Sequence, residues 1–222
     1  MCGRFSLKAH PDDLWKALGT EPLPGYRARY NVAPTQSVLA VVLEDGVRRP
    51  RLLHWGLIPF WADDPRIGNR LINARSETVA TKPAFRSAFA RRRCLVAADG
   101  FYEWQAGPSG KQPYRIRKRD ESPFCFAGLW ERWERGGQPI ESCTILTGAA
   151  NAAIAPIHDR MPVILEPAAY DLWISPETGA EHLKQLLNDP TRVELEAYPV
   201  STLVNRPAND LAECVESIAD YT

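Results

Sequence analysis

The chain has 222 residues, enough to bury a sizeable core, and we expect a single domain over residues 1–222. Its 27 lysines and arginines balance 27 aspartates and glutamates, so no overall positive charge favours a nucleic acid or an anionic membrane, and any polyanion site has to be local. The five cysteines are an odd number without a C-x-x-C pair, which argues against a disulfide framework and against a zinc site.

The chain opens with MCGRF, which places a cysteine directly after the initiator methionine. Removal of the first methionine is favoured when the next side chain is small, so we expect the mature chain to begin at Cys2. A terminal cysteine carries an α-amine with a pKa near ~7.8, and part of that amine is neutral at pH 7. With an aldehyde, such an amine forms a Schiff base, and the adjacent thiol closes a thiazolidine ring. This chemistry needs a terminus that solvent can reach, and the same terminus could also serve acyl transfer.

Runs of β-branched and aromatic residues predict strands along most of the chain. The predicted strands cover residues 37–43, 94–104, 113–118, 123–130, 143–149 and 161–166. The predicted helices cover residues 11–19, 82–93, 167–174 and 179–190. Because strands and helices do not alternate strictly, a doubly wound parallel sheet is disfavoured. We expect an α+β domain with a largely antiparallel, barrel-like β core and peripheral short helices.

Aromatic residues and arginines are interleaved between residues 55 and 75. The aromatic members are Trp55, Phe60 and Trp61, and the arginines are Arg66, Arg70 and Arg75. Bases of single-stranded DNA stack on aromatic rings, at ~1 to 3 kcal/mol each, while guanidinium groups hold phosphates. Tryptophans are more often core residues, so a structural interpretation of this stretch stays open.

Two further stretches carry candidate polar groups. In RRRCLVAADGFYEW, the arginines at 91–93 are typical of a solvated helix end, and strand alternation puts Phe101 and Glu103 on one face. An apolar pocket would raise the pKa of Glu103 and allow proton exchange near neutral pH, although an exposed glutamate fits the spacing equally well. In APIHDRMPVIL, His158 is a candidate proton carrier, but a lone histidine is more often structural. Asn31, before a Val-Ala-Pro turn, is interpreted as structural.

Taken together, MCGRF, YNVAPTQ, WGLIPFW, LINARSET, DGFYEW and IHDRMPVIL, in this order over nearly the whole chain, closely resemble the SOS response-associated peptidase (SRAP) family. The resemblance implies a sensor and shield for abasic sites in single-stranded DNA. Its terminal cysteine captures the ring-opened sugar aldehyde in a covalent thiazolidine crosslink. The resemblance also implies lyase and self-processing peptidase activities, and it implies no cofactor.

The resemblance assigns roles to individual residues. Cys2 is the nucleophile, Asn73 orients the reacting group, Glu103 shuttles protons, and His158 assists at the Schiff-base stage. The DNA contacts that it implies are Arg4, Pro34, Trp61, Arg75, Trp104 and Arg160. We expect a monomer whose partner is single-stranded DNA with abasic sites, with replication or repair machinery as further partners.

The N-terminal stretch has no apolar h-region, and no run approaches the ~18 apolar residues of a membrane helix, so we expect a cytoplasmic protein, nucleoid-associated if bacterial, without a membrane partner. Two alternatives to the crosslinking function stay open. One is an N-terminal-nucleophile amidohydrolase, because class II glutamine amidotransferases also begin with MCG. The other is a non-covalent module that binds single-stranded DNA through residues 55–75.

Overall fold

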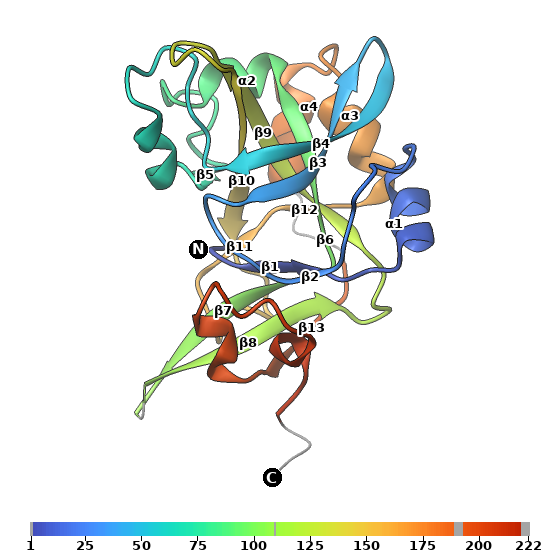
Figure 1. The fold of residues 1–222 in the computed structure, drawn as a ribbon, viewed down its shortest axis with the longest axis vertical. Coiled ribbons are helices and arrows are strands. Elements are labelled where there is room, and N and C mark those ends of the chain that lie inside the picture. Colours follow the sequence, from blue (N-terminus) through green and yellow to red (C-terminus); the bar gives the residue numbers. More distant parts are fainter. Residues whose placement is uncertain (1, 109, 189–192, 219–222) are drawn as a thin grey trace.

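A computed structural model of the protein describes residues 2–108, 110–188 and 193–218, and two β-sheets form its centre (Figure 1). The larger sheet has eight strands in the order β11-β10-β4-β3-β6-β9-β12, with β5 beside β10. These strands are β3 (Ser37–Glu44), β4 (Val47–Trp55), β5 (Asn73–Arg75), β6 (Arg93–Ala98), β9 (Phe124–Trp133), β10 (Ile140–Ala149), β11 (Arg160–Pro162) and β12 (Ile164–Leu165).

The larger sheet closes on itself. Strands β9 and β10 pair along their length, so that β10, β4, β3, β6 and β9 form a ring. Most neighbours run antiparallel, whereas β10 runs parallel to β4 and to β5. The predicted α+β class with a largely antiparallel, barrel-like core is therefore confirmed.

The smaller sheet lies below the larger one in Figure 1 and has five strands in the order β13-β8-β7-β1-β2. They are β1 (Phe5–Leu7), β2 (Arg29–Val32), β7 (Gly100–Gly107), β8 (Gly110–Lys118) and β13 (Leu195–Pro199). Apolar side chains from both sheets form one buried cluster that includes Cys2, Phe5 and Phe101. The ring of Phe5 lies 5.1 Å from that of Trp55 and 5.8 Å from that of Phe126, between centroids. The first strand is thus part of the junction between the sheets.

The chain passes from the larger sheet to the smaller one at Asp99. Residues 94–104, predicted as one strand, are split there into β6 and β7. The buried Asp99 carboxylate accepts hydrogen bonds from Ser6 Oγ at 2.7 Å, Arg115 Nη2 at 3.0 Å and the Ala9 backbone N–H at 2.8 Å. This carboxylate therefore fastens β1 to the point where the chain changes sheets.

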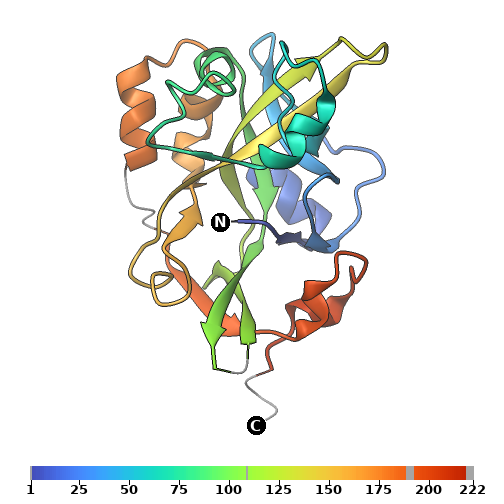
Figure 2. The ribbon, with the colours of Figure 1, turned by 90° about the vertical axis from the view of Figure 1, so that its left-hand side faces the viewer.

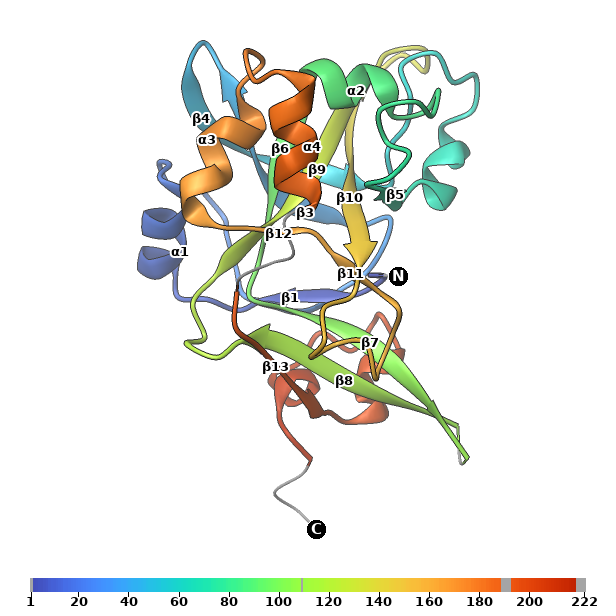
Figure 3. The ribbon, with the colours of Figure 1, turned by 180° about the vertical axis from the view of Figure 1, so that it is seen from behind.

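The helices lie outside the sheets, as predicted. They are α1 (Pro11–Leu18), α2 (Arg86–Arg91), α3 (Tyr170–Ile174) and α4 (Ala180–Asn188), with short 3-10 turns η1 (Pro65–Arg70), η2 (Pro167–Ala169), η3 (Thr202–Asn205) and η4 (Ala212–Val215). Figure 3 shows α2, α3 and α4 gathered over the back of the larger sheet. Within the described ranges, we find no helix with the length and apolar character needed to span a bilayer.

The arginines at 91–93 do not behave as one solvated helix end, so that prediction is wrong for two of them. Arg91 is exposed, but Arg92 Nη2 lies 2.8 Å from Glu131 Oε2. Arg93 is only 2% exposed because it begins the buried strand β6. Its guanidinium donates to three backbone carbonyls, those of Phe89, Trp173 and Ser175.

Candidate functional site

The start of the chain lies between the two sheets, on the face that Figure 2 turns to the viewer. Cys2 is 0% exposed and packs in the apolar cluster that joins the sheets. Burial raises the pKa of the Cys2 thiol far above its usual value, and the negative charge of Glu103 raises it further. The expectation of a solvent-accessible terminus is therefore not met in this chain, in which Met1 still precedes Cys2.

Asn73 contacts the backbone of Cys2. It stands on the three-residue strand β5, which β10 holds in parallel register with Asn73 opposite Ile145. The Asn73 side-chain Nδ2 donates to the Cys2 carbonyl oxygen at 2.7 Å. Its Oδ1 is buried and accepts no hydrogen bond from the described residues. Asn73 thus fixes the Cys2 carbonyl, and its Oδ1 can accept a hydrogen bond from a further donor.

Glu103 approaches the same place from β7. The predicted alternation holds, because Phe101 packs in the cluster of Cys2 while Tyr102 and Trp104 pack in another. Glu103 is 3% exposed, and burial raises the pKa of its carboxyl. The charge of His158 lowers this pKa and so opposes part of the shift. The charge of Glu103 acts on the pKa of Cys2, and the charge of His158 acts on the pKa of Glu103, so Glu103 lies within electrostatic range of both. A buried carboxyl of this kind can exchange protons closer to neutral pH.

His158 lies in the loop that precedes β11. This loop is tied to β7 by Gln105, whose Nε2 donates to the Pro156 carbonyl at 3.0 Å. The imidazole Nδ1 accepts from the Arg160 backbone N–H at 2.9 Å, and it also lies 2.9 Å from Asp159 Oδ1. The structure thus brings together the four residues expected to carry the chemistry, while their roles stay predictions.

Arg4 is half-buried, and its guanidinium makes contacts within the protein. Its Nη1 donates to Asn31 Oδ1 at 2.9 Å and to the Val204 carbonyl at 2.5 Å, and its guanidinium lies 6.0 Å from the centre of the Trp104 ring. Burial lowers the pKa of Arg4. Trp104 itself donates from Nε1 to Asn205 Oδ1 at 2.7 Å. These contacts make Arg4 and Trp104 part of the wall next to the site.

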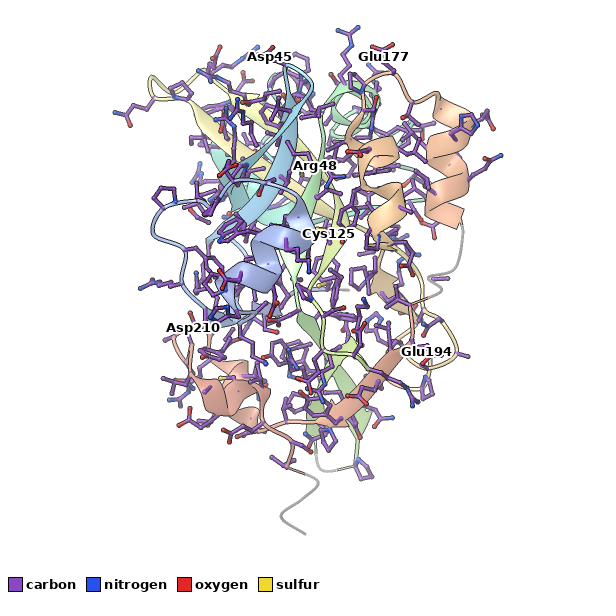
Figure 4. The ribbon with its side chains drawn as sticks, turned by 90° about the vertical axis from the view of Figure 1, so that its right-hand side faces the viewer. Asp45, Arg48, Cys125, Glu177, Glu194 and Asp210 are labelled. Atoms are coloured by element: carbon purple, nitrogen blue, oxygen red, sulfur yellow. The ribbon has the colours of Figure 1, made fainter. Side chains whose placement is uncertain are left out.

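The structural interpretation of Asn31 is confirmed. This side chain is fully buried, and its Nδ2 donates to the carbonyls of Val204, Arg206 and Asn209. Asp210 adds a second link, because its carboxylate accepts from the backbone N–H groups of Tyr30 at 2.6 Å and Asn31 at 2.9 Å. Figure 4 labels Asp210 where the C-terminal segment meets this part of the chain. Residues 204–210 are therefore fastened to β2 by hydrogen bonds.

The remaining predicted DNA contacts differ in how open they are. Trp61 is 40% exposed and Arg75 is exposed, whereas Pro34 is half-buried. Arg160 is engaged, because its Nη1 and Nη2 lie 2.8 and 2.9 Å from the two carboxylate oxygens of Glu77. Trp55 is fully buried, as the structural interpretation of tryptophans allows. Only part of the interleaved stretch is therefore available to a nucleic acid.

Sequence reasoning missed Glu77, which reaches the loop of His158 through Arg160. It lies in the LINARSET motif, but an exposed glutamate two residues after an arginine carries no signal of a partner 83 positions away. Thr147 was missed as well. Its backbone carbonyl accepts from Arg160 Nη2 at 2.6 Å, and its buried Oγ1 has no partner among the described residues. In the part of the chain that the structure describes, no group of acidic, histidine or cysteine residues could hold a metal ion.

Comparison with known proteins gives a consistent result. Residues 1–207 match the family described as SOS response associated peptidase (SRAP). The chain is 42% identical over 223 residues to the abasic site processing protein YoqW of Bacillus subtilis, covering 98% of this chain and all of that protein. It is 34% identical to the abasic site processing protein HMCES of Xenopus tropicalis, over 98% of this chain and 78% of that protein.

Solved structures share the fold. A protein from Bacteroides thetaiotaomicron superposes with a TM-score of 0.87 at 25% identity, over 97% of this chain and 99% of that one. A phage-related protein from Bordetella bronchiseptica superposes with a TM-score of 0.73 at 32% identity, over 90% of this chain and 94% of that one. The overall fold thus recurs in other proteins.

Proposed function

The chain belongs to the SOS response associated peptidase (SRAP) family, and we propose that it processes abasic sites in single-stranded DNA by a covalent crosslink through Cys2. The observation that carries the proposal is the convergence of Asn73, Glu103 and His158 on the start of the chain. The names of the relatives support abasic-site processing, and the chemistry of an N-terminal cysteine supplies the mechanism.

The proposed reaction begins with removal of Met1, which frees the α-amine of Cys2. That amine attacks the C1′ aldehyde of the ring-opened sugar, and loss of one water gives a Schiff base. The Cys2 sulfur then adds to the imine carbon, forming the C–S bond, while the thiol proton passes to the nitrogen. The net change is one water released, so the reaction needs no oxidant, reductant or cofactor.

The neighbouring residues fit the proton transfers in this sequence. Glu103, whose pKa burial raises, is placed to give a proton to the departing hydroxyl and to take one from the incoming amine. We assign His158 assistance at the Schiff-base stage, because it lies within electrostatic range of Glu103. Asn73 holds the Cys2 carbonyl, so that the amine and the thiol keep a fixed orientation.

Two further activities follow from the same intermediate and terminus. A Schiff base at C1′ promotes loss of the 3′ phosphate, so lyase cleavage of the strand competes with ring closure by the thiol. The peptidase of the family name would act at the bond before Cys2, and an aminopeptidase can also remove Met1 there. We therefore propose crosslinking as the main outcome, and cleavage as the minor one.

The test uses an oligonucleotide with one abasic site and protein whose loss of Met1 is verified by mass. Wild type is expected to give a heat-stable adduct with the mass of protein plus DNA minus one water. Cys2→Ala should give none, and Cys2→Ser only a heat-labile imine. Cys125→Ala, in the interior of the larger sheet (Figure 4), is the matched control and should still crosslink.

The same assay addresses the alternatives. If verified wild-type protein forms no adduct, the proposal is rejected. Release of ammonia from glutamine would then favour an amidohydrolase. Equal binding of intact and abasic DNA by wild type and Cys2→Ala, without any adduct, would favour a non-covalent binding module.

A further inference from the structure

Two neighbouring aromatic side chains are held out to solvent by a closed turn after β4. Phe60 is 50% exposed and Trp61 is 40% exposed. They are the two central residues of a β-turn, which the Ala62 N–H closes by donating to the Pro59 carbonyl at 2.9 Å. Trp61 is already a predicted DNA contact, whereas Phe60 has no assigned role.

Both ends of this turn are anchored in the larger sheet. The Ile58 N–H donates to Ser142 Oγ at 2.8 Å, and the Ala62 carbonyl accepts from Trp133 Nε1 at 2.7 Å. The side chains of Ile58, Ala62 and Trp133 pack in one buried cluster. Because the turn is fixed on both sides, a flat ligand that stacks on its central residues orders little of the chain and loses little entropy in doing so.

The turn lies close to the reacting end of the chain. Its anchor Ser142 stands on β10, three residues before Ile145, the residue that pairs with Asn73. Three residues of a strand span about 10 Å. Figure 2 shows the segment between β4 and β5, coloured cyan to teal, on the face that carries the start of the chain. A DNA strand held at Cys2 can therefore reach this turn.

Phe60 also lines an open groove in which the charges are paired. The other lining residues are Ser87, Arg92, Trp130, Glu131, Arg132 and Glu134. Arg92 Nη2 lies 2.8 Å from Glu131 Oε2, and Arg132 Nε lies 2.7 Å from Glu134 Oε1. Because each guanidinium has a carboxylate beside it, the lining has no net charge with which to attract a phosphate.

We infer that Phe60 is a stacking platform for one unpaired base that flanks the abasic site. The groove offers that base the exposed ring of Phe60 and the half-buried Trp130, and stacking on aromatic rings needs no charge. This inference rests on the proposed function for the position of the base relative to the lesion. The stacking itself concerns DNA binding and can be measured without a crosslink.

The experiment measures the Kd for single-stranded DNA with a central tetrahydrofuran, an abasic analogue that has no aldehyde and so cannot crosslink. Phe60→Ala, Phe60→Leu and Phe60→Trp are compared with wild type. Leu172→Ala is the matched control, because Leu172 is 54% exposed on α3, over the back of the larger sheet (Figure 3). A second tetrahydrofuran then replaces each flanking nucleotide in turn, which removes one base at a time.

For Phe60→Ala, we expect the Kd to rise by about fivefold, the low end of the range for one base–aromatic stack. Phe60→Leu should lose most of the same factor, because it keeps apolar area without a ring, and Phe60→Trp should bind at least as tightly as wild type. The slope of log K against log salt should stay the same in all three, because no phosphate contact is lost. Leu172→Ala should match wild type throughout.

The scan of flanking positions locates the base. At one position, its removal should weaken binding by wild type about fivefold and leave binding by Phe60→Ala unchanged, because the stack is already lost in that variant.

An unchanged Kd in Phe60→Ala would overturn the inference, and so would full binding by Phe60→Leu. A loss that no single base accounts for, or a smaller salt slope in Phe60→Ala, would overturn it as well. If wild type forms no adduct with a natural abasic site, the proposed function fails, and the Kd series still decides whether a base stacks on Phe60.

Discussion

Glu103 shows how strongly burial shapes a single residue at this site. The residue is 3% exposed, and this burial raises the pKa of its carboxyl. A raised pKa suits proton exchange near neutral pH, yet it means that the ionised form is destabilised in the folded protein. The residue therefore costs stability at the pH where we propose it to act.

The variant Glu103→Gln tests this trade-off. We expect it to lose most crosslinking activity and to raise the free energy of unfolding at pH 7, because it removes the cost of burying an ionised carboxylate. Urea unfolding at several pH values measures the second effect. A variant less stable than wild type at pH 7 would contradict the assigned direction of the pKa shift.

The pH dependence has a definite sign. Between the unfolded pKa of Glu103, near ~4.3, and its raised folded pKa, the native state binds more protons than the unfolded state. The free energy of unfolding of wild type therefore falls as the pH rises through this window. Because glutamine does not titrate, the advantage of Glu103→Gln should vanish below about pH 4 and be complete above the folded pKa.

At the scale of residues, the sequence could predict neighbours along the chain but not partners across it. The period of two in a strand was enough to place Glu103 on the face of Phe101. The link from Glu77 to Arg160 spans 83 positions, and the link from Arg4 to Val204 spans 200. No local pattern encodes such pairs, because they arise only when the two sheets meet.

At the scale of elements, the change of sheet at Asp99 was the feature hardest to foresee. Residues 94–96 and 101–104 include strong β-formers, so the sequence indicates one strand, although Asp99 and Gly100 between them are depleted in strands. The break depends on Asp99 binding Ser6 and Arg115, which come from two other strands. Strand β4 was missed for another reason: it contains the run RRPR, whose side chains are partly or fully exposed. Both cases depend on tertiary contacts rather than on propensity.

Arg93 connects elements in a way that stability measurements can test. Its guanidinium donates to carbonyls near the ends of α2 and α3, so Arg93→Met should leave these acceptors without partners. A buried acceptor without a partner costs about 1 to 3 kcal/mol, and we expect a total loss of about 3 kcal/mol in the free energy of unfolding.

Arg91→Ala is the matched control, because Arg91 is the exposed member of the same arginine run. Its effect on chemical unfolding should stay within about 0.5 kcal/mol. Equal effects of the two substitutions would show that the buried contacts of Arg93 contribute little.

At the scale of the whole molecule, the balance of charge limits how DNA can be attracted. With 27 cationic and 27 acidic side chains, long-range attraction to phosphates is weak and contacts have to be local. Among the predicted contacts, Arg75 is exposed, whereas Arg4 and Arg160 make internal contacts. We therefore expect few phosphate contacts and modest non-covalent affinity.

The salt dependence of binding measures this directly. For about two or three phosphate contacts to a single strand, log K should fall with log salt with a slope of about −1.4 to −2.1. Arg75→Ala should reduce the magnitude of that slope by about 0.7. Arg119→Ala should leave the slope unchanged, because the Arg119 backbone contacts Glu194 on the face shown in Figure 4, opposite that of Figure 2. Equal slopes for the two variants would remove Arg75 from the DNA contacts.

The fold class was predictable, whereas the ring was not. Many short strands with peripheral helices indicate an α+β domain with an antiparallel core. The closure between β9 and β10, and the parallel placement of β5 on β10, are long-range pairings that the sequence does not display.

The position of β10 has a consequence for motion. This strand is bonded to β4, β5, β9 and β11, so we expect its paired amide hydrogens to exchange slowly with water. The short strand β5, which carries Asn73, would be unstable if isolated. Because it pairs with β10 at Ile145, we expect it to open only as slowly as β10 does. The contact of Asn73 with the Cys2 carbonyl should therefore persist for as long as the ring of strands stays closed.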